Sequence, residues 1–260
     1  MPTLTMPGAK LHYVERGRGP LLVMIPGGPA DAGVFAALCD ALESRYRVVA
    51  YDPRGNSGSV FDGSPVAADL DVFGDDAARL IAALGGPAFV LGSSGGAQIG
   101  ANLLARHPAC VARLVAHEPP CMALLPDADR FVTGIEDIRR IYREQGLMPA
   151  MMAFIQLAGI RERPQPPGDP AAMAQMQNNL DYFLTHGMVA ISRYRPDVAA
   201  LRGRPITVGV GEESAGELAH RCALVLAEAL GVKPVTFPGA HVGYGSHPEA
   251  FAEVLTRVLS

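Results

Sequence analysis

The most constraining feature of this chain is the stretch 88–100, where an apolar run leads into a glycine-flanked serine and then into a helical pattern. It contains the G-x-S-x-G motif Gly92-Ser93-Ser94-Gly95-Gly96. Glycines two residues before and after the central serine let a strand and a helix pack closely at a sharp turn, because they carry no Cβ. The motif predicts a strained turn with an exposed Ser94 hydroxyl, the arrangement of a catalytic nucleophile.

The neighbouring sequence supports this interpretation over a plain glycine-rich turn, which is the alternative in a chain with 29 glycines. Residues 88–92 are continuously apolar and predict a buried strand. After the motif, Ile99, Leu103 and Leu104 have the spacing of one apolar helix face. The strand, turn and helix that a nucleophilic serine of this kind requires are therefore all predicted.

Length and composition indicate one globular domain with an insertion. The chain has 260 residues, of which 49% are hydrophobic and 18% charged, enough to bury a full core. Its four cysteines are widely spaced and include no C-x-x-C pair, so neither a disulfide framework nor a zinc site is predicted.

Charge and the N-terminal sequence exclude several classes of partner. The net charge is −4 and no basic run is present, which argues against nucleic acid and anionic membranes as partners. Residues 1–8 lack the pattern of a signal peptide, and no apolar stretch approaches the length of a membrane span. We therefore expect a cytoplasmic protein. The sequence leaves the oligomeric state open, a homo-oligomer included.

Apolar runs and helical patterns alternate along most of the chain. The runs that predict strands are 11–16, 21–25, 46–51, 88–92, 111–116, 206–210 and 232–237. The turn sequence 17–20 between the first two predicts that they pair as a hairpin. Repeated strand-helix units predict an α/β fold with a mostly parallel central sheet and helices on both faces.

One long segment departs from this alternation. From 121 to 201 the periodicity is helical, and seven of the ten methionines lie there. We predict a core domain built from 1–120 and 202–260, with 121–201 inserted as a helical cap. Methionine is an adaptable apolar residue, so some of these side chains are expected to face a cavity, although most of them fit a helical core.

The order of elements, the serine turn and a late histidine together resemble the α/β-hydrolase superfamily over essentially the whole chain. The segment 121–201 resembles that family's helical cap. The stretch 26–29, Pro-Gly-Gly-Pro, resembles its oxyanion loop, with proline in place of the usual histidine. The stretches 52–59 and 237–241 resemble the loop after the next strand and the histidine loop.

The resemblance implies roles that the chemistry explains. A serine hydroxyl is a weak nucleophile and needs a general base, which in this fold comes late in the chain, so His241 is the candidate. Negative charge that develops on the attacked carbonyl oxygen needs backbone N–H donors. Gly28 and Gly95 are the candidates for this oxyanion hole.

The acid of a Ser-His-acid triad is the point at which the sequence departs from the family. Most members carry an aspartate where this chain has Ser214. Glu118, which ends the strand 111–116, is the candidate that we favour, and Glu213 is the alternative. Either residue also fits the role of a loop carboxylate paired with an arginine.

These residues predict a serine hydrolase that cleaves a carboxylic ester, lactone or thioester of a small apolar molecule through an acyl-enzyme on Ser94. No metal or organic cofactor is required. One alternative is a catalytically weak ligand-binding homologue, which the missing aspartate favours because an acid contributes strongly to such triads. C–C hydrolases, amidases and perhydrolases on the same fold are further alternatives.

Overall fold

The computed structural model describes residues 2–161 and 169–260. Residues 162–168, which fall within the predicted cap, lie outside the described residues. The described residues form a nine-stranded sheet with the order β1-β2-β4-β3-β6-β7-β8-β9, and β5 pairs with β2. The strands are β1 (Thr3–Met6), β2 (Ala9–Arg16), β3 (Leu21–Ile25), β4 (Arg47–Tyr51), β5 (Val60–Phe61), β6 (Ala88–Ser93), β7 (Val111–His117), β8 (Ile206–Gly211) and β9 (Val235–Phe237).

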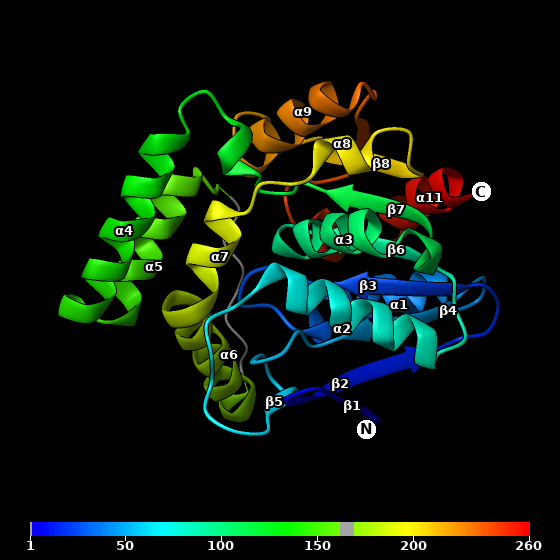
Figure 1. Ribbon diagram of the computed structural model, residues 1–260, viewed down its shortest axis with the longest axis horizontal. Helices are drawn as coiled ribbons and strands as arrows, with labels where there is room; N and C mark the ends of the chain where they lie inside the picture. Colours follow the sequence, from blue (N-terminus) through cyan, green and yellow to red (C-terminus); the bar gives the residue numbers. More distant parts are fainter. Residues whose placement is uncertain (1, 162–168) are drawn as a thin grey trace.

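Helices cover both faces of this sheet (Figure 1). They are η1 (Ala32–Phe35), α1 (Ala36–Leu42), α2 (Leu70–Ala83), α3 (Gly95–Arg106), η2 (Pro108–Cys110), η3 (Met122–Leu124), α4 (Ala128–Gln145), α5 (Leu147–Ala158), α6 (Pro170–Tyr182), η4 (Phe183–Gly187), α7 (Met188–Arg193), α8 (Val198–Leu201), α9 (Leu218–Leu230), α10 (Gly243–Ser246) and α11 (Pro248–Leu259). Across residues 2–161 and 169–260, no helix is both long and apolar enough to cross a lipid bilayer. The predicted fold class, a mostly parallel sheet between two helical layers, is confirmed.

Strand β3 contributes side chains to the cores on both faces of the sheet, and these cores hold the two helical layers against it. All five of its residues are buried. Because successive side chains of a strand point to opposite faces, Val23 packs in the core beneath α2, α3 and α9, whereas Met24 packs in the core beneath α1 and α11. A strand that is apolar on both faces needs neighbours on both edges, and β3 lies between β4 and β6 through parallel pairing.

The predicted hairpin between 11–16 and 21–25 is wrong. Strand β2 pairs antiparallel with β4 and with β1, and it makes no ladder with β3. The physical reason lies in burial, since β2 is partly exposed along its length and suits a position near the edge. The shorter, fully apolar β3 takes a central position instead. The hairpin that opens the fold is β1–β2, and β1 was not predicted.

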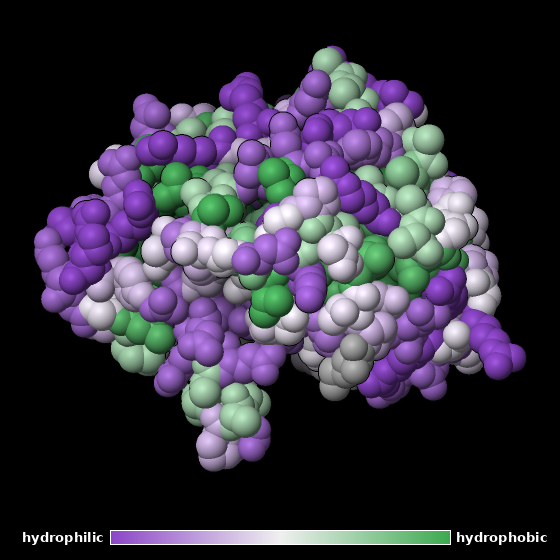
Figure 2. Space-filling view, turned by 60° about the horizontal axis from the view of Figure 1, so that its bottom comes forward, coloured by the Kyte–Doolittle hydropathy of each residue, from purple (hydrophilic) through white to green (hydrophobic). Residues whose placement is uncertain are grey.

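Helices α4 to α7, here called the inserted helices, stand beyond the carboxyl ends of the parallel strands (Figure 1). They have an apolar core of their own, in which Ile135 and Ile138 of α4 pack with Phe183 and Met188. The last helix of the segment 121–201, α8, packs instead against α3 and α9. The face drawn in Figure 2 is mostly hydrophilic, with small separate hydrophobic areas between the polar residues.

A buried ion pair fixes the loop after β4 to helix α2. The Arg54 guanidinium donates from Nε to Asp76 Oδ2 at 2.6 Å and from Nη2 to Asp76 Oδ1 at 2.7 Å. The two side chains are 7% and 2% exposed. Removing one partner of such a pair leaves an uncompensated charge away from water, which is strongly destabilising.

We expect Asp76→Asn to lower the free energy of unfolding by about 3 kcal/mol, because the amide cannot neutralise the buried Arg54. Urea unfolding followed by circular dichroism measures this. Asp137→Asn is the matched control, since Asp137 pairs with Arg140 on the exposed surface of α4 and its loss should change the free energy of unfolding by less than about 1 kcal/mol. Equal effects of the two substitutions would contradict the role of the buried pair.

Candidate active site

Ser94 lies between β6 and α3 in a strained conformation, with φ 55° and ψ −125°. The glycines of the motif make this turn possible. A Cβ at Gly96 would lie 2.0 Å from the carbonyl oxygen of Ile25, and a Cβ at Gly92 would lie 2.4 Å from that of Gly96. Larger residues at these positions would therefore force β3, β6 and α3 apart.

The Ser94 side chain is half-buried and forms no capping hydrogen bond to α3. Its hydroxyl is therefore not used in holding the helix. The Ser94 backbone N–H donates to the His117 carbonyl at 2.9 Å, which ties the turn to β7. Gly95 begins α3, so its N–H belongs to the positive end of the helix dipole.

The loop after β3 lies directly against this turn. A Cβ at Gly27 would lie 2.6 Å from both Gly95 N and Ser94 Cβ, so only glycine permits the approach. Gly28 has a φ of 56°, a conformation that side chains disfavour. Its nitrogen lies 3.3 Å from the position of a Cβ at Gly95. The structure thus brings together the two predicted oxyanion-hole residues, Gly28 and Gly95, beside Ser94.

Glu118 follows the last residue of β7 and is fully buried. It too has a positive φ, 48°. Its Oε2 lies 2.6 Å from His241 Nδ1, and its Oε1 accepts the Gly211 N–H at 2.9 Å. The Ser214 hydroxyl also donates to Oε1. The structure therefore brings the predicted base and the favoured acid together.

The ionisation of Glu118 determines how His241 is protonated. Burial alone would raise the pKa of Glu118. The hydrogen bond from His241, the electrostatic influence of His117 and His241, and the Ser214 hydroxyl together lower that pKa to about 2. An ionised carboxylate only accepts hydrogen bonds, so Nδ1 of His241 must carry a proton. In neutral His241 the other nitrogen, Nε2, then has the free lone pair that a general base needs.

The alternative acid, Glu213, is exposed and does not occupy the place beside His241 Nδ1. Its backbone N–H donates to the Gly239 carbonyl at 3.0 Å, and its own carbonyl accepts from Arg161. Ser214, at the position of the usual aspartate, is buried and supports Glu118. Sequence reasoning did not assign this role to Ser214, because the pairing depends on the alignment of β7 with β8.

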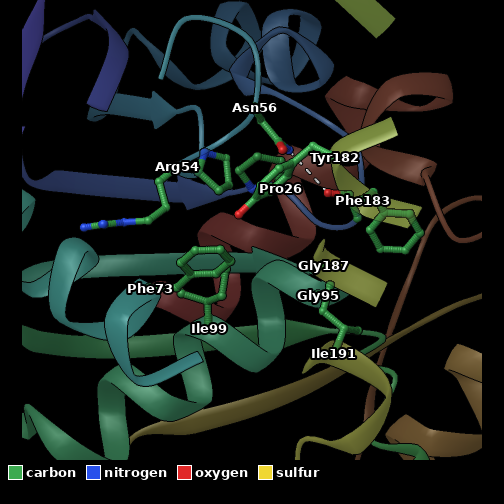
Figure 3. Close-up of a pocket in the computed structure, with 12 residues that line it drawn as sticks. Pro26, Arg54, Asn56, Phe73, Gly95, Ile99, Tyr182, Phe183, Gly187 and Ile191 are labelled. Atoms are coloured by element: carbon green, nitrogen blue, oxygen red, sulfur yellow. Dashed lines mark hydrogen bonds between the residues drawn. The ribbon is translucent and has the colours of Figure 1, made fainter. Parts of the chain in front are cut away.

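A small cavity of about 20 Å³ lies between the serine turn and the inserted helices (Figure 3). It is lined by Pro26, Gly28, Pro53, Arg54, Asn56, Phe73, Gly95, Ile99, Tyr182, Phe183, Gly187 and Ile191. This volume suffices for about one water molecule. None of the methionines of 121–201 lines this space, to which the inserted helices contribute aromatic rings and Ile191 instead. Met152 lines a separate, more open hollow on α5, so the expectation that some of these methionines face a cavity is met there and not beside Ser94.

His117, the last residue of β7, is fully buried beside the site. Its ring lies edge-on to Phe237 and Phe251, and neither of its nitrogens has a hydrogen-bond partner in the described part of the chain. Burial lowers the pKa of His117 to about 4. No sequence motif includes this residue, and its contacts are those of a core side chain. As for metals, the described residues contain no group of three or more histidine, cysteine or acidic side chains arranged to hold one.

Comparison with known proteins gives consistent results. Residues 20–155 match the sequence model of the alpha/beta hydrolase fold. An uncharacterized hydrolase, YraK, of Bacillus subtilis (strain 168) is 34% identical over 99% of this chain and 95% of that protein. A zearalenone hydrolase of Bionectria ochroleuca is 26% identical over 98% of this chain and 96% of that one. The crystal structure of the enol-lactonase from Burkholderia xenovorans LB400 superposes with a TM-score of 0.74 at 22% identity, covering 99% of each chain.

The lowered pKa of His117 predicts a loss of stability in mild acid. Between pH 6.5 and about 4 the unfolded chain binds a proton that the folded protein excludes, so stability falls as the pH falls through this window. His117→Leu removes that proton. Between pH 7 and pH 4, we expect the free energy of unfolding of the variant to fall by about 3 kcal/mol less than that of the wild type, as measured by urea unfolding.

The contribution of Glu118 is separable in the same titration. Its lowered pKa gives stability that is present above pH 4.5 and is lost only as the pH falls towards about 2. The two residues therefore act in windows that barely overlap. Parallel pH dependences of wild type and His117→Leu above pH 4.5 would contradict the assignment to His117.

Proposed function

Because this chain belongs to the α/β-hydrolase family, we propose that it is a serine hydrolase that cleaves a carboxylic ester, lactone or thioester of a small apolar molecule. The observation that carries the proposal is the 2.6 Å contact between Glu118 Oε2 and His241 Nδ1. It gives His241 a fixed orientation and the tautomer of a general base. The strained Ser94 turn then supplies the nucleophile.

The reaction follows from these groups. His241 Nε2 takes the Ser94 hydroxyl proton as Oγ attacks the carbonyl carbon of the substrate. The N–H groups of Gly28 and Gly95 stabilise the negative charge that develops on the carbonyl oxygen. Protonated His241 then donates its proton to the leaving oxygen or sulfur, and an acyl group stays on Ser94. Water, activated by the same histidine, releases the acid product.

The buried Glu118 favours turnover over a purely ligand-binding role. During each half-reaction His241 becomes positively charged, and an ionised carboxylate on Nδ1 stabilises that charge. The missing aspartate at Ser214 was the main argument for a weak or inactive protein. Glu118 removes that argument, because it supplies a carboxylate to His241 from the end of β7, where most family members supply one from the loop after β8.

The substrate class is inferred from the cavity and from the relatives. Phe73, Ile99, Phe183 and Ile191 give the space beside Gly95 an apolar lining. Two relatives that match nearly the whole chain are named as hydrolases. The cavity has room for about one water molecule, so we expect the inserted helices to shift when a substrate binds.

Labelling with a fluorophosphonate, followed by peptide mass spectrometry, tests the proposal without a known substrate. We expect rapid labelling on the peptide that carries Ser94, and none in Ser94→Ala. Glu118→Gln should slow labelling and ester hydrolysis by about 10⁴-fold, the loss that follows when a triad acid is replaced by its amide.

Glu213→Gln is the matched control, since it makes the same chemical change at the exposed alternative acid. It should label at the wild-type rate. Slower labelling in Glu213→Gln than in Glu118→Gln would reverse the assignment of the acid. A wild-type protein that remains unlabelled while properly folded would overturn the proposed hydrolase.

Ile191 of α7 offers a test of the substrate pocket. Its Cδ1 lies 2.9 Å from the position of a Cβ at Gly95, so it covers the oxyanion site. Ile191→Ala should raise the hydrolysis rate of p-nitrophenyl butyrate relative to that of the acetate by about 10-fold. The reason is that the shorter side chain leaves space for the two additional methylene groups, and one methylene in an apolar pocket typically changes the rate by about this factor. Val189→Ala, on the same helix but outside the cavity lining, should leave this ratio unchanged. An unaltered ratio in Ile191→Ala would place the acyl group elsewhere.

A further inference from the structure

A second histidine lies against the carboxylate that holds His241. His220 belongs to the first turn of α9, and its side chain is 14% exposed. Its Nδ1 lies 3.1 Å from Ser214 Oγ and 3.5 Å from Glu118 Oε1. Helix α9 thus reaches the candidate acid at Oε1, whereas His241 contacts Oε2.

Counting protons fixes the direction of these hydrogen bonds. Ionised Glu118 and the Gly211 carbonyl can only accept, and the charged carboxylate is the stronger acceptor, so the single hydroxyl proton of Ser214 is directed to Oε1. Ser214 Oγ then has only lone pairs to offer to His220. His220 Nδ1 must therefore carry a proton and donate it to Ser214. The result is a chain of donors, from His220 through Ser214 to Glu118.

We propose that His220 is a positioning residue of the active site, which acts through Ser214 to hold Glu118 in the orientation that His241 requires. This inference rests on the proposed hydrolase function. It assigns a purpose to the serine at the usual aspartate position: the side chain there supports an acid supplied from β7.

The alternative partner of Ser214 explains why this support matters. Ser214 Oγ also lies 3.1 Å from the Gly211 carbonyl oxygen, to which its proton can turn. A donor on the serine lone pair restricts that rotation and keeps the hydroxyl on Glu118. Without His220, the serine divides its proton between two acceptors. Glu118 Oε1 then retains the Gly211 N–H at 2.9 Å as its fixed donor.

Kinetics on three histidine variants test the proposal. His220→Leu removes the donor and should lower kcat and the fluorophosphonate labelling rate by about 10-fold with KM unchanged, as expected for one lost hydrogen bond. His220→Asn keeps an N–H near the place of Nδ1 and should stay within about 2-fold of wild type. The control is His107→Leu at the far end of α3, where His107 contacts Asp75 at 2.7 Å. It should leave the rates unchanged.

Combination with Ser214→Ala tests whether His220 acts through the serine. We expect the double variant His220→Leu, Ser214→Ala to lose less activity than the product of the two single losses. A loss equal to that product would show that His220 acts independently of Ser214, and a larger loss would show that each side chain partly compensates for the absence of the other; either result would overturn the proposal. Equal losses in His220→Leu and His220→Asn, or a rise in KM alone, would likewise overturn the proposal.

A spectroscopic measurement separates this inference from the hydrolase proposal. The ¹H and ¹⁵N resonances of the histidine rings report which nitrogen carries the proton, whether or not the protein turns over a substrate. We expect His220 to be protonated at Nδ1, and the downfield Nδ1 proton of His241 to shift in His220→Leu but not in His220→Asn. If the protein is never labelled by the fluorophosphonate but shows these shifts, the hydrolase proposal is contradicted and the hydrogen-bond chain is supported. Normal labelling with unchanged resonances contradicts the role of His220.

Discussion

A carboxylate that is fully removed from water must be surrounded by donors, and this requirement organises the site around Glu118. The donors come from two segments that are distant from Glu118 in the sequence: the end of β8 with the loop after it, which supplies Gly211 and Ser214, and the loop after β9, which supplies His241. The parallel alignment of β7 with β8 and of β8 with β9 brings these segments to one edge of the sheet. The packing of the central strands thus determines whether the histidine has an acid at all.

Much of the site is encoded locally and was predictable from the sequence. Ser94, Gly28 and Gly95 belong to short stretches in which glycine is required because two backbones approach within contact distance. The apolar run of β6 predicted a buried strand for the same kind of reason, since such a run must be covered on both faces. The mostly parallel sheet followed from their alternation with helices.

What the sequence left open depends on contacts between distant segments. Glu118 and Glu213 are both carboxylates beside strand ends, and only the three-dimensional arrangement separates a buried acid from an exposed one. The hairpin prediction failed for the same reason, because a short turn between β2 and β3 is also compatible with β4 lying between them. His220 lies on an ordinary amphipathic helix, and only the folded structure shows that it contacts Ser214 and Glu118.

The backbone at Ser94 and Glu118 has a consequence for how this protein responds to mutation. Both residues have positive φ, a conformation that costs a non-glycine residue about 1–3 kcal/mol. Glycine would relax the backbone at either position. At Glu118 it would also leave the Gly211 N–H, the Ser214 hydroxyl and His241 without their buried acceptor, so the strain is outweighed there by the lost hydrogen bonds. Ser94 has no such compensation in the part of the chain that the structure describes, so thermal tolerance and the proposed turnover pull in opposite directions at this residue. A lineage or a laboratory library selected for heat resistance alone would enrich glycine at position 94 and arrive at a more stable protein that lacks the proposed nucleophile.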